Sequence, residues 1–466
     1  MEKVYISHSS KPRLILVFLG WGMDATPFAG LSKNGYDILA ISNYSRYSPD
    51  TDLPDLINEL SSYREIVVIA WSFGVRIATD LLNMASGLPI TRTIAVNGTE
   101  KHIDDKFGIP QAIFDGTLQN LSPRSIWKFQ RRMFVSSEAF AAFQQMKPQR
   151  SFDSMLDELR TFASLQPAIH ARWDYAIVGL SDAIFPSENQ QNAWHGIPAD
   201  LVDGMPHFPD MQQIINQYVI DKELVAEKFS NAVGTYGSNA TPQKAAARKL
   251  WELTYPHLPS ISDSPRVLEV GVGEGTLTEL YLPSLRNSNI TLWDIASLPS
   301  LKLPPSVNLE CLDAETAIRT LPDESINIIL SSSTLQWFNS PTEFIRETAR
   351  VLRPGGIAAF SFFGPETYRE ISAATGRTLR YPTSCQLIEA ATGKMELLVS
   401  EEETITMTFA TVADALRHIK HTGVNAISRD AGGSKDSIRL LRRYPLAPDG
   451  AAPLTYHPLH IVFKKL

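Results

Sequence analysis

The stretch RVLEVGVGEGTLTELY, residues 266–281, decides the fold of the second half of the chain. It opens with RVLEVG (266–271), which predicts a β-strand. Gly271, Gly273 and Gly275 follow at intervals of two, and the residues after them predict a helix. This order of strand, glycine turn and helix predicts the first unit of an α/β fold with a parallel sheet.

The same alternation of strands and helices continues on both sides of this stretch. Further strands are predicted at 289–294, 307–312, 325–331 and 356–363. Two later stretches, TITMTF (404–409) and LTYHPLHIVFKKL (454–466), predict antiparallel strands. The pattern starts afresh near Asp221, so we expect one domain over 221–466 and another over 1–220.

The glycine turn and the strand ends of the second domain indicate an S-adenosylmethionine site. The glycine spacing is tighter than the G-x-G-x-x-G of dinucleotide sites. Glu269, just before the glycines, suits a cationic ligand that bears an amino acid, and Asp294 ends the next strand, where an acid binds ribose hydroxyls. Asp313 and the N–H of Ala314 are candidates for the adenine. With RPGG at 353–356, the series predicts a class I methyltransferase with a Rossmann-like sheet. The alternatives are a nucleotide-binding or an inactive α/β domain.

Several segments of this domain resemble the BioC family, which methylates the free carboxyl of malonyl-acyl-carrier protein. They are KFSNAVGTYGSNA (228–240), TLQWF (334–338), SFFGPETYREI (361–371), IKHTGVNAIS (419–428) and LTYHPLHIVFKK (454–465). The sequence departs from the family at Ser332-Ser333, where a pair with an asparagine is usual. We expect Tyr236, Gln336 and Trp337 to close over the methyl acceptor; the alternative is that Tyr236 and Trp337 are core aromatics.

The first half of the chain predicts another α/β domain. Strands are expected at 14–19, 36–41, 66–71, 93–96, 175–180 and 197–202, with helices at 52–63 and 74–85. From Ser122 to Gln166 the sequence predicts amphipathic helices without a strand. Such an insertion between late strands is expected to form a helical cap (residues 122–166) over an active site.

Ser72 follows the strand IVVIAW directly and precedes a predicted helix, as the serine of a nucleophile elbow does. The leading glycine of that motif is Ala70 here, and the alternative is a serine that caps the helix. Asp182 and His207 each follow a strand, which gives the chain order Ser, acid, His of an α/β-hydrolase triad. Three other acids compete with Asp182, namely Asp174, Asp203 and Asp210, but the first precedes its strand and the others crowd the histidine. The alternative for His207 is a surface loop histidine.

The candidate donors for an oxyanion are two backbone N–H groups. Trp21 lies in the Gly20-Trp21-Gly22 turn after the first strand, and Phe73 follows Ser72. In hydrolases these two places supply the oxyanion hole. The alternative is a simple glycine turn.

Four segments of this half resemble the BioG family of α/β-hydrolase carboxylesterases. They are GWGMD (20–24), AWSFG (70–74), the DxIFPxxNQxxxW run (182–194) and PHFPD (206–210). The family cleaves the methyl ester of pimeloyl-acyl-carrier protein in biotin synthesis. The resemblance covers residues 1–220 and implies Ser72 as nucleophile and His207 as base, whereas Asp182 depends on chain order.

A basic stretch lies in the expected cap. SPRSIWKFQRR (122–132) carries Arg124, Lys128, Arg131 and Arg132 and no acid, and the spacing places much of this charge on one helical face. Acyl carrier proteins are acidic, so we expect this face to dock one. The alternative is a solvated helix face.

Composition and charge narrow the remaining possibilities. With 44% hydrophobic and 20% charged residues the chain is neither disordered nor fibrous, and a net charge of -7 argues against a nucleic-acid binder. The longest apolar run, 14–23, is too short to span a membrane, and no secretory signal is expected. Two cysteines, Cys311 and Cys385, favour a reducing, cytoplasmic location, and no metal site is expected.

The sequence therefore predicts a bifunctional enzyme of biotin-precursor synthesis. One domain would methylate malonyl-acyl-carrier protein with S-adenosylmethionine, and the other would hydrolyse pimeloyl-acyl-carrier-protein methyl ester to the free acid and methanol. The alternatives are a methyltransferase fused to a broad carboxylesterase or thioesterase, or to an inactive hydrolase domain that docks the carrier protein.

Overall fold

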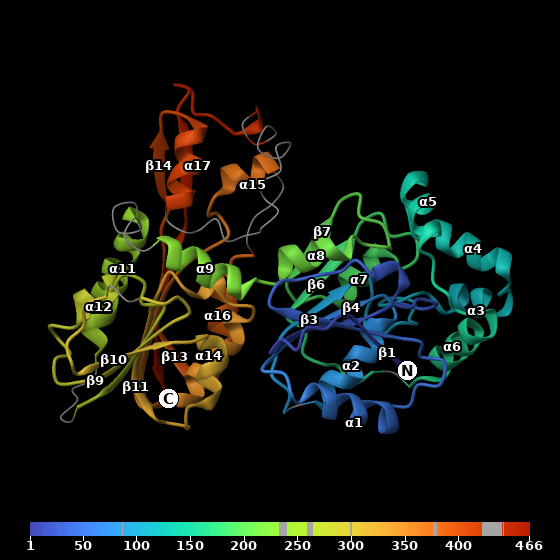
Figure 1. The fold of residues 1–466 in the computed structure, drawn as a ribbon, viewed down its shortest axis with the longest axis horizontal. Coiled ribbons are helices and arrows are strands. Elements are labelled where there is room, and N and C mark those ends of the chain that lie inside the picture. Colours follow the sequence, from blue (N-terminus) through green and yellow to red (C-terminus); the bar gives the residue numbers. More distant parts are fainter. Residues whose placement is uncertain are drawn as a thin grey trace. The chain divides into compact units, whose positions relative to one another are not determined.

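The chain divides into two compact units, Met1–Ile215 and Asn216–Leu466. The computed structural model, drawn in Figure 1, describes residues 1–85, 87–166, 168–232, 240–258, 264–298, 301–375, 380–421, 440 and 442–466. The candidate residue Tyr236 lies outside the described residues.

The first unit is built on a seven-stranded sheet in the order β1-β3-β2-β4-β5-β6-β7. The strands are β1 (Glu2–Ser7), β2 (Arg13–Phe18), β3 (Tyr36–Ser42), β4 (Glu65–Trp71), β5 (Ile90–Val96), β6 (Tyr175–Gly179) and β7 (Ala199–Val202). All neighbours pair in parallel except β1, which runs antiparallel to β3. The buried strands β3 and β4 have no exposed residue, as continuous apolar runs predict. Strand β1 was not predicted, because its exposed and half-buried residues form no apolar run.

Helices cover this sheet and form the insertion after β5. They are α1 (Pro49–Leu60), α2 (Gly74–Met84), α3 (Gln111–Gln119), α4 (Pro123–Arg132), α5 (Ser137–Gln145), α6 (Phe152–Ser164), α7 (Ser187–Ala193) and α8 (Met211–Tyr218). Helices α4, α5 and α6 fill 122–166 without a strand, as predicted, and gather with α3 on one side of the unit (Figure 1). Each of the three starts where a serine hydroxyl (Ser122, Ser136, Ser151) accepts a free N–H of the first turn.

The second unit has a seven-stranded sheet in the order β10-β9-β8-β11-β12-β16-β13. Its strands are β8 (Arg266–Val270), β9 (Asn289–Asp294), β10 (Val307–Cys311), β11 (Ile326–Ser332), β12 (Leu352–Phe363), β13 (Met395–Glu402) and β16 (Pro458–Lys465). Strands β8 to β12 are parallel, whereas β16 runs antiparallel to both β12 and β13. A separate antiparallel pair consists of β14 (Ile405–Phe409) and β15 (Ala452–Tyr456). The predicted strand 454–466 is thus two strands in different sheets, interrupted at His457.

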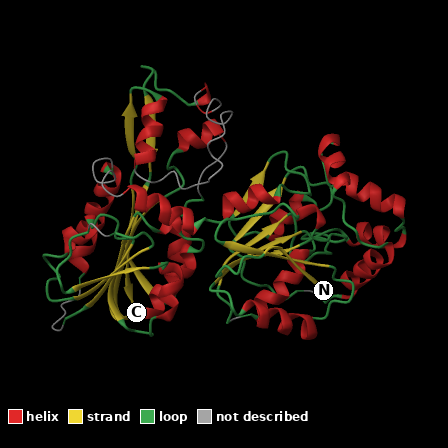
Figure 2. Cartoon of the chain, viewed as in Figure 1, coloured by secondary structure: helices red, strands yellow, loops and turns green. Residues whose placement is uncertain are grey.

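Helices pack on both faces of this second sheet, as Figures 1 and 2 show. They are α9 (Lys222–Ala232), α11 (Thr241–Thr254), α12 (Thr276–Tyr281), α13 (Ala314–Ala317), α14 (Pro341–Val351), α15 (Arg369–Thr375), α16 (Ser384–Ala391) and α17 (Val412–His421). One apolar core joins α11 and α12 to the sheet, and a second core on the opposite face joins α14 and α16. The strand orders are those of an α/β-hydrolase and of a class I methyltransferase, so both fold predictions are confirmed.

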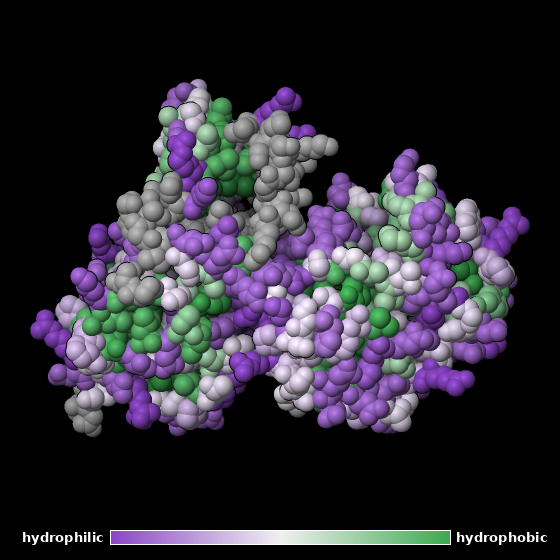
Figure 3. Space-filling model, viewed as in Figure 1, coloured by the Kyte–Doolittle hydropathy of each residue, from purple (hydrophilic) through white to green (hydrophobic). Residues whose placement is uncertain are grey.

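Hydrophobic side chains form scattered patches among hydrophilic ones on the face drawn in Figure 3. Within the described ranges, no helix is long and apolar enough to cross a membrane. The same ranges contain no cluster of three His, Cys, Asp or Glu residues that could hold a metal ion.

Candidate active sites

Ser72 stands on a strained turn between β4 and α2. Its φ of 57° lies in the left-handed region, where residues other than glycine are uncommon. The turn is crowded: a Cβ at Gly74 would lie 2.5 Å from the carbonyl oxygen of Phe18, and a Cβ at Gly98 would collide with the backbone of Ser72. Ser72 does not cap α2, because the N-cap residue is Phe73 and no side chain bonds the first turn. The strand–turn–helix geometry is therefore that of a nucleophile elbow.

Ser72, His207 and Asp182 form a continuous chain of contacts. Nε2 of His207 lies 3.0 Å from Oγ of Ser72, and Nδ1 lies 2.8 Å from Oδ2 of Asp182. The side chains of His207 and Asp182 are buried, and Ser72 is 5% exposed. Two of the competing acids bond other groups: Asp174 accepts the N–H of Thr93, and Asp210 accepts that of Gln213. The third, Asp203, is exposed.

The backbone holds the histidine of this chain in place. The carbonyl oxygen of His207 accepts hydrogen bonds from the indole of Trp71 at 2.8 Å and the amide of Asn97 at 3.0 Å. The ring of Phe185 stacks on the imidazole at 6.1 Å with an interplanar angle of 14°. The imidazole is thereby fixed between Ser72 and Asp182.

A cavity opens on Ser72 beneath the helical cap. Its lining includes side chains from α3, α4 and α6, so the cap does cover Ser72. The lining residues are Trp21, Ser72, Phe73, Ile109, Ile113, Phe114, Thr117, Phe129, Arg132, Leu159, Ala183 and Ile184. Neither the backbone N–H of Trp21 nor that of Phe73 donates to another group in the described part of the chain. Both candidate oxyanion donors therefore border the cavity that contains the serine.

The basic residues of α4 separate into two groups. Arg124, Lys128 and Arg132 are exposed and four residues apart, so they share one helical face, which we term the basic face. Arg132 also lines the cavity of Ser72. Arg131 is half-buried instead: it donates to the carbonyl of Phe134 at 2.8 Å, and its guanidinium lies 5.7 Å from the ring centre of Phe140.

The second unit contains a cavity at the carboxyl ends of β8, β9 and β11. Predicted cofactor residues Gly271, Gly273, Asp294, Asp313 and Ala314 all line it. The other lining residues are Lys222, Val225, Phe229, Val270, Glu274, Trp293, Ile295, Ala296, Leu298, Leu312, Ser332, Ser333, Thr334, Trp337 and Phe338.

Asp294 and the glycine turn are bonded to each other. The Asp294 carboxylate accepts the N–H groups of Gly273 and Ala296, each at 2.8 Å. Burial raises the pKa of Asp294, and these hydrogen bonds oppose the rise. Gly271 has a φ of 76° and no room for a side chain beside Thr334, so the turn requires glycine there.

Glu269 does not face this cavity, contrary to expectation. Its carboxylate accepts the hydroxyls of Thr278 at 2.6 Å and Tyr281 at 2.7 Å, both on α12. Burial raises the pKa of Glu269 to about 7. The residue therefore joins β8 to α12, and Gly275, also absent from the cavity lining, serves as the N-cap of α12.

A smaller cavity adjoins the first and shares Phe229, Ser333 and Trp337 with it. Its remaining lining residues are Gln243, Gln336, Phe363, Thr367, Tyr368 and Tyr381. Of the predicted pair, Trp337 lies where the two cavities meet, and Gln336 lines the smaller cavity. The hydroxyls of Ser333 and Tyr381 are buried and have no hydrogen-bond partner in the part of the chain that is described.

Comparisons with known proteins agree with this division. The family model described as pimeloyl-ACP methyl esterase BioG matches residues 1–201, and a methyltransferase-domain model matches 268–360. A malonyl-(acyl-carrier protein) O-methyltransferase of Bacteroides fragilis is 35% identical over 464 residues, which cover 97% of this chain and 92% of the relative. The chain belongs to this methyltransferase family, with a BioG domain at its N-terminus.

Other relatives correspond to one half only. A malonyl-(acyl-carrier protein) O-methyltransferase of Haemophilus influenzae is 31% identical and covers 52% of this chain and 94% of its own length. The crystal structure of BioG from Haemophilus influenzae is 32% identical, covers 44% of this chain and 95% of its own, and has a TM-score of 0.39. The two family models and the Bacteroides fragilis relative, which matches 97% of this chain, confirm the fusion predicted from the sequence.

Sequence reasoning missed three residues of the methyltransferase and BioG domains. Lys222 is buried in the larger cavity, with Nζ 2.7 Å from Glu315 and 3.5 Å from Asp313. Tyr381 lines the smaller cavity, and Gln190 donates to Asp182 at 3.2 Å. Lys222 and Tyr381 lie in segments far from the motifs they approach, so no local pattern marks them.

Proposed function

We propose that the chain carries two enzymes of opposite effect on one kind of carboxyl group. The methyltransferase, within residues 221–466, methylates the free carboxyl of malonyl-acyl-carrier protein. The esterase, within 1–220, hydrolyses pimeloyl-acyl-carrier-protein methyl ester to pimeloyl-acyl-carrier protein and methanol. The chain of contacts from Ser72 through His207 to Asp182 is the observation that carries the hydrolytic activity.

Hydrolysis follows from this geometry in two steps. Oγ of Ser72 attacks the ester carbonyl while Nε2 of His207 accepts its proton, and the N–H groups of Trp21 and Phe73 bind the developing oxyanion. Asp182 stabilises the protonated histidine, which then gives the proton to the departing methoxide to form methanol. Water attacks the acyl-serine next, again with His207 as base, and releases the free carboxylate.

The surroundings of Ser72 suit a long acyl chain on an acidic carrier. Ile113, Phe129 and Leu159 give the cavity an apolar wall that fits methylene groups. Arg132 lines the same cavity and also belongs to the basic face of α4. A carrier protein docked on that face would therefore hold its acyl chain next to the entrance of the cavity.

The larger cavity of the second unit fits S-adenosylmethionine. Gly271 and Gly273 leave backbone accessible for the amino-acid part, Asp294 suits the ribose hydroxyls, and Asp313 with the N–H of Ala314 suits the adenine. The buried hydroxyl of Ser332 borders the cavity without a partner among the described residues, as a ligand-binding group would. When bound, this cofactor supplies an electrophilic methyl group on a positively charged sulfur.

The smaller cavity suits the carboxylate that accepts the methyl group. A malonyl carboxylate is already ionised at neutral pH, so the protein need only orient it and exclude water. Gln336 and the free hydroxyls of Ser333 and Tyr381 are neutral donors, and no lysine or arginine lies among the cavity's described lining residues. Neutral donors position a carboxylate without the ion pair that would lower its nucleophilicity. Trp337 closes the contact.

The two activities fit together because of charge. An ionised carboxylate is costly to bury in an apolar acyl tunnel, and methylation removes that charge. Hydrolysis restores it once the chain has been extended. The methyltransferase therefore acts first and the esterase last.

Mass spectrometry of acyl-carrier protein tests both activities. Malonyl-carrier protein incubated with the chain and S-adenosylmethionine should gain the mass of one CH₂, and the pimeloyl methyl ester should lose the same mass without the cofactor. Unchanged masses in both incubations would refute the proposal. Loss of the whole acyl group from the carrier would instead indicate a thioesterase.

A further inference from the structure

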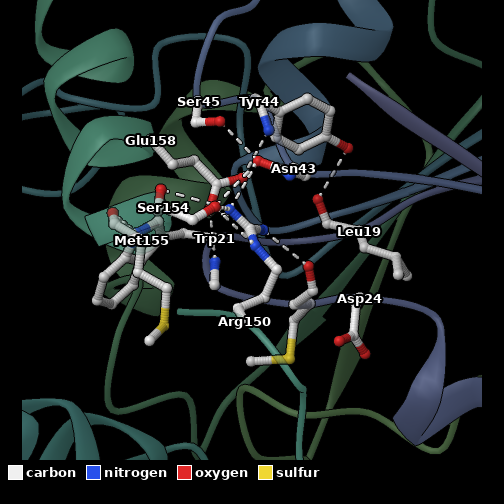
Figure 4. A network of polar contacts seen from close by, with 12 residues as sticks. Leu19, Trp21, Asp24, Asn43, Tyr44, Ser45, Arg150, Ser154, Met155 and Glu158 are labelled. Carbon is white, nitrogen blue, oxygen red and sulfur yellow. Dashed lines mark hydrogen bonds and ion pairs between the residues drawn. The ribbon is translucent and has the colours of Figure 1, made fainter. Parts of the chain in front are cut away.

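Glu158 of α6 contacts the turn that carries Trp21, although 136 residues separate it from Gly22. Its side chain is fully buried. Oε2 accepts the N–H of Gly22 at 2.9 Å, and Oε1 accepts the N–H of Tyr44 at 2.9 Å. One carboxylate of the helical cap thus bonds two backbone segments at the carboxyl ends of β2 and β3, as Figure 4 shows for Tyr44 and its neighbours.

Arg150 compensates the buried charge of Glu158. Its Nη1 lies 3.3 Å from Oε2 of Glu158, and its side chain is 5% exposed. The same guanidinium donates to the carbonyl of Met23 at 3.1 Å. It also donates to Oδ1 of Asn43 at 2.8 Å, as Figure 4 shows. A buried carboxylate persists only when such partners replace water. The pair is therefore a fixed element that requires both side chains.

Helix α6 also holds the side chain of Trp21. The indole N–H donates to the carbonyl of Met155 at 2.8 Å, and the two residues lie side by side in Figure 4. Gly22, next in sequence, has a φ of 72°, and a Cβ there would lie 3.3 Å from the sulfur of Met155. The side chain of Trp21 and the peptide that follows it are thus both bonded to one helix. This leaves little freedom for the backbone N–H of Trp21, which borders the cavity of Ser72.

We propose that Glu158, held by Arg150, is a positioning residue for ester hydrolysis: it fixes the Gly20–Gly22 turn so that the Trp21 N–H points at the oxyanion. The inference rests on the proposed esterase function. It goes further in making the oxyanion site depend on the helical cap. Displacement of α6 would release the Gly22 N–H and the Trp21 indole together, so the esterase is fully active only with α6 in place.

The variant Glu158→Gln tests this proposal in the full chain. An amide has one acceptor oxygen for two N–H donors, so one of them loses its bond. We expect kcat for the pimeloyl methyl ester to fall by about 10- to 100-fold, somewhat less than complete loss of an oxyanion donor costs. KM should change little, because ground-state contacts to the acyl chain remain.

A pair of inhibitors distinguishes a loss of oxyanion positioning from a general loss of structure in the active site. A trifluoromethyl ketone matched to the substrate binds by adding Oγ of Ser72 to its carbonyl carbon; the proton passes to His207 and the ketone oxygen becomes the oxyanion. Its affinity should fall in parallel with kcat. The matched compound with CH₂ in place of the carbonyl should bind as it does to the wild type. Methyl transfer by the same chain should be unchanged.

Two further variants keep the test decisive. Asp157→Asn on the same helix alters a half-exposed residue paired with Arg160 and should leave hydrolysis unchanged. If Glu158→Gln does not fold, Arg150→Lys retains a cation and should show the same parallel loss of kcat and ketone affinity. The proposal is overturned if Glu158→Gln and Arg150→Lys both keep the wild-type kcat. It is also overturned if the affinities for the two inhibitors fall equally. Absence of ester hydrolysis by the wild-type chain would instead overturn the esterase function itself, and hydrolysis that survives Ser72→Ala would exclude Ser72 as the nucleophile.

Discussion

Oδ2 of Asp182 lies 2.8 Å from Nδ1 of His207, and the other carboxylate oxygen is bonded to the backbone N–H groups of Ile184 at 2.7 Å and Phe185 at 2.9 Å. These two N–H groups orient the carboxylate so that Oδ2 accepts a hydrogen bond from Nδ1 of His207. His207 then carries its proton on Nδ1 and presents a free Nε2 to Ser72. The sequence offers three acids that compete with Asp182, and this geometry supports Asp182 as the proposed acid of the triad.

Asp182→Asn should lower kcat for ester hydrolysis by about 10³- to 10⁴-fold, because an amide that donates to Nδ1 favours the wrong tautomer. KM should stay close to the wild-type value. Steady-state kinetics with the pimeloyl methyl ester measure both. Asp203→Asn serves as the control among the competing acids, and a loss in that variant instead would move the acid to residue 203.

Ser72→Ala and Asp294→Ala should separate the two activities. Without its nucleophile the esterase should retain less than about 0.1% of its rate, with methyl transfer intact. Asp294→Ala removes the acceptor proposed for the ribose and frees the Gly273 N–H, so the Kd for S-adenosylmethionine should rise at least about 10-fold. Calorimetry measures the Kd for S-adenosylmethionine, and assays of ester hydrolysis and methyl transfer measure the two rates in each variant. Coupled losses in either variant would mean that the units do not work independently.

The site residues that directly follow a strand could be predicted from the sequence. Ser72, Asp182 and His207 converge because parallel strands end at the same edge of the sheet, as do Asp294 and Asp313. It did not reveal which side of β8 Glu269 would face. The edge strands β1 and β13 were missed because most of their residues are exposed or half-buried. Lys222 and Tyr381 reach their cavities only through tertiary packing.

Charge reversal on the basic face of α4 should weaken use of the carrier-bound ester. Arg124→Glu combined with Lys128→Glu should raise KM for the pimeloyl-carrier ester by roughly 10-fold, because like charges now face an acidic partner. A short methyl ester without carrier should be hydrolysed at the wild-type rate. Rising salt should raise KM for the wild type and not for the variant.

The matched control for this charge reversal is Arg160→Glu. Arg160 lies on α6 with 63% of its side chain exposed and outside the basic face. Its reversal changes the net charge without changing α4, so KM should move by less than about 2-fold. A similar rise in KM for both variants would point to a general effect of net charge and against a docking face.

Glu269 should make the stability of the methyltransferase unit depend on pH. Burial raises its pKa from the ordinary 4.5 to about 7 in the folded chain. Folding therefore favours the protonated acid: its contribution is fully present below about pH 4.5 and is lost as pH rises through about 7. Glu269→Gln keeps an acceptor for Thr278 and Tyr281 and cannot ionise. The stability of this variant relative to the wild type should thus rise between about pH 5 and pH 8, by up to about 3 kcal/mol.

Hydrogen exchange of the β8 amides, expressed as protection factors at each pH, measures this difference within the full chain. Comparing variant with wild type cancels the titration of every other group. Thr278→Val provides the control for the hydrogen bond alone, since it removes one donor and leaves the ionisable carboxyl. A difference between Glu269→Gln and wild type that does not change with pH would show that Glu269 titrates near its ordinary value in the fold.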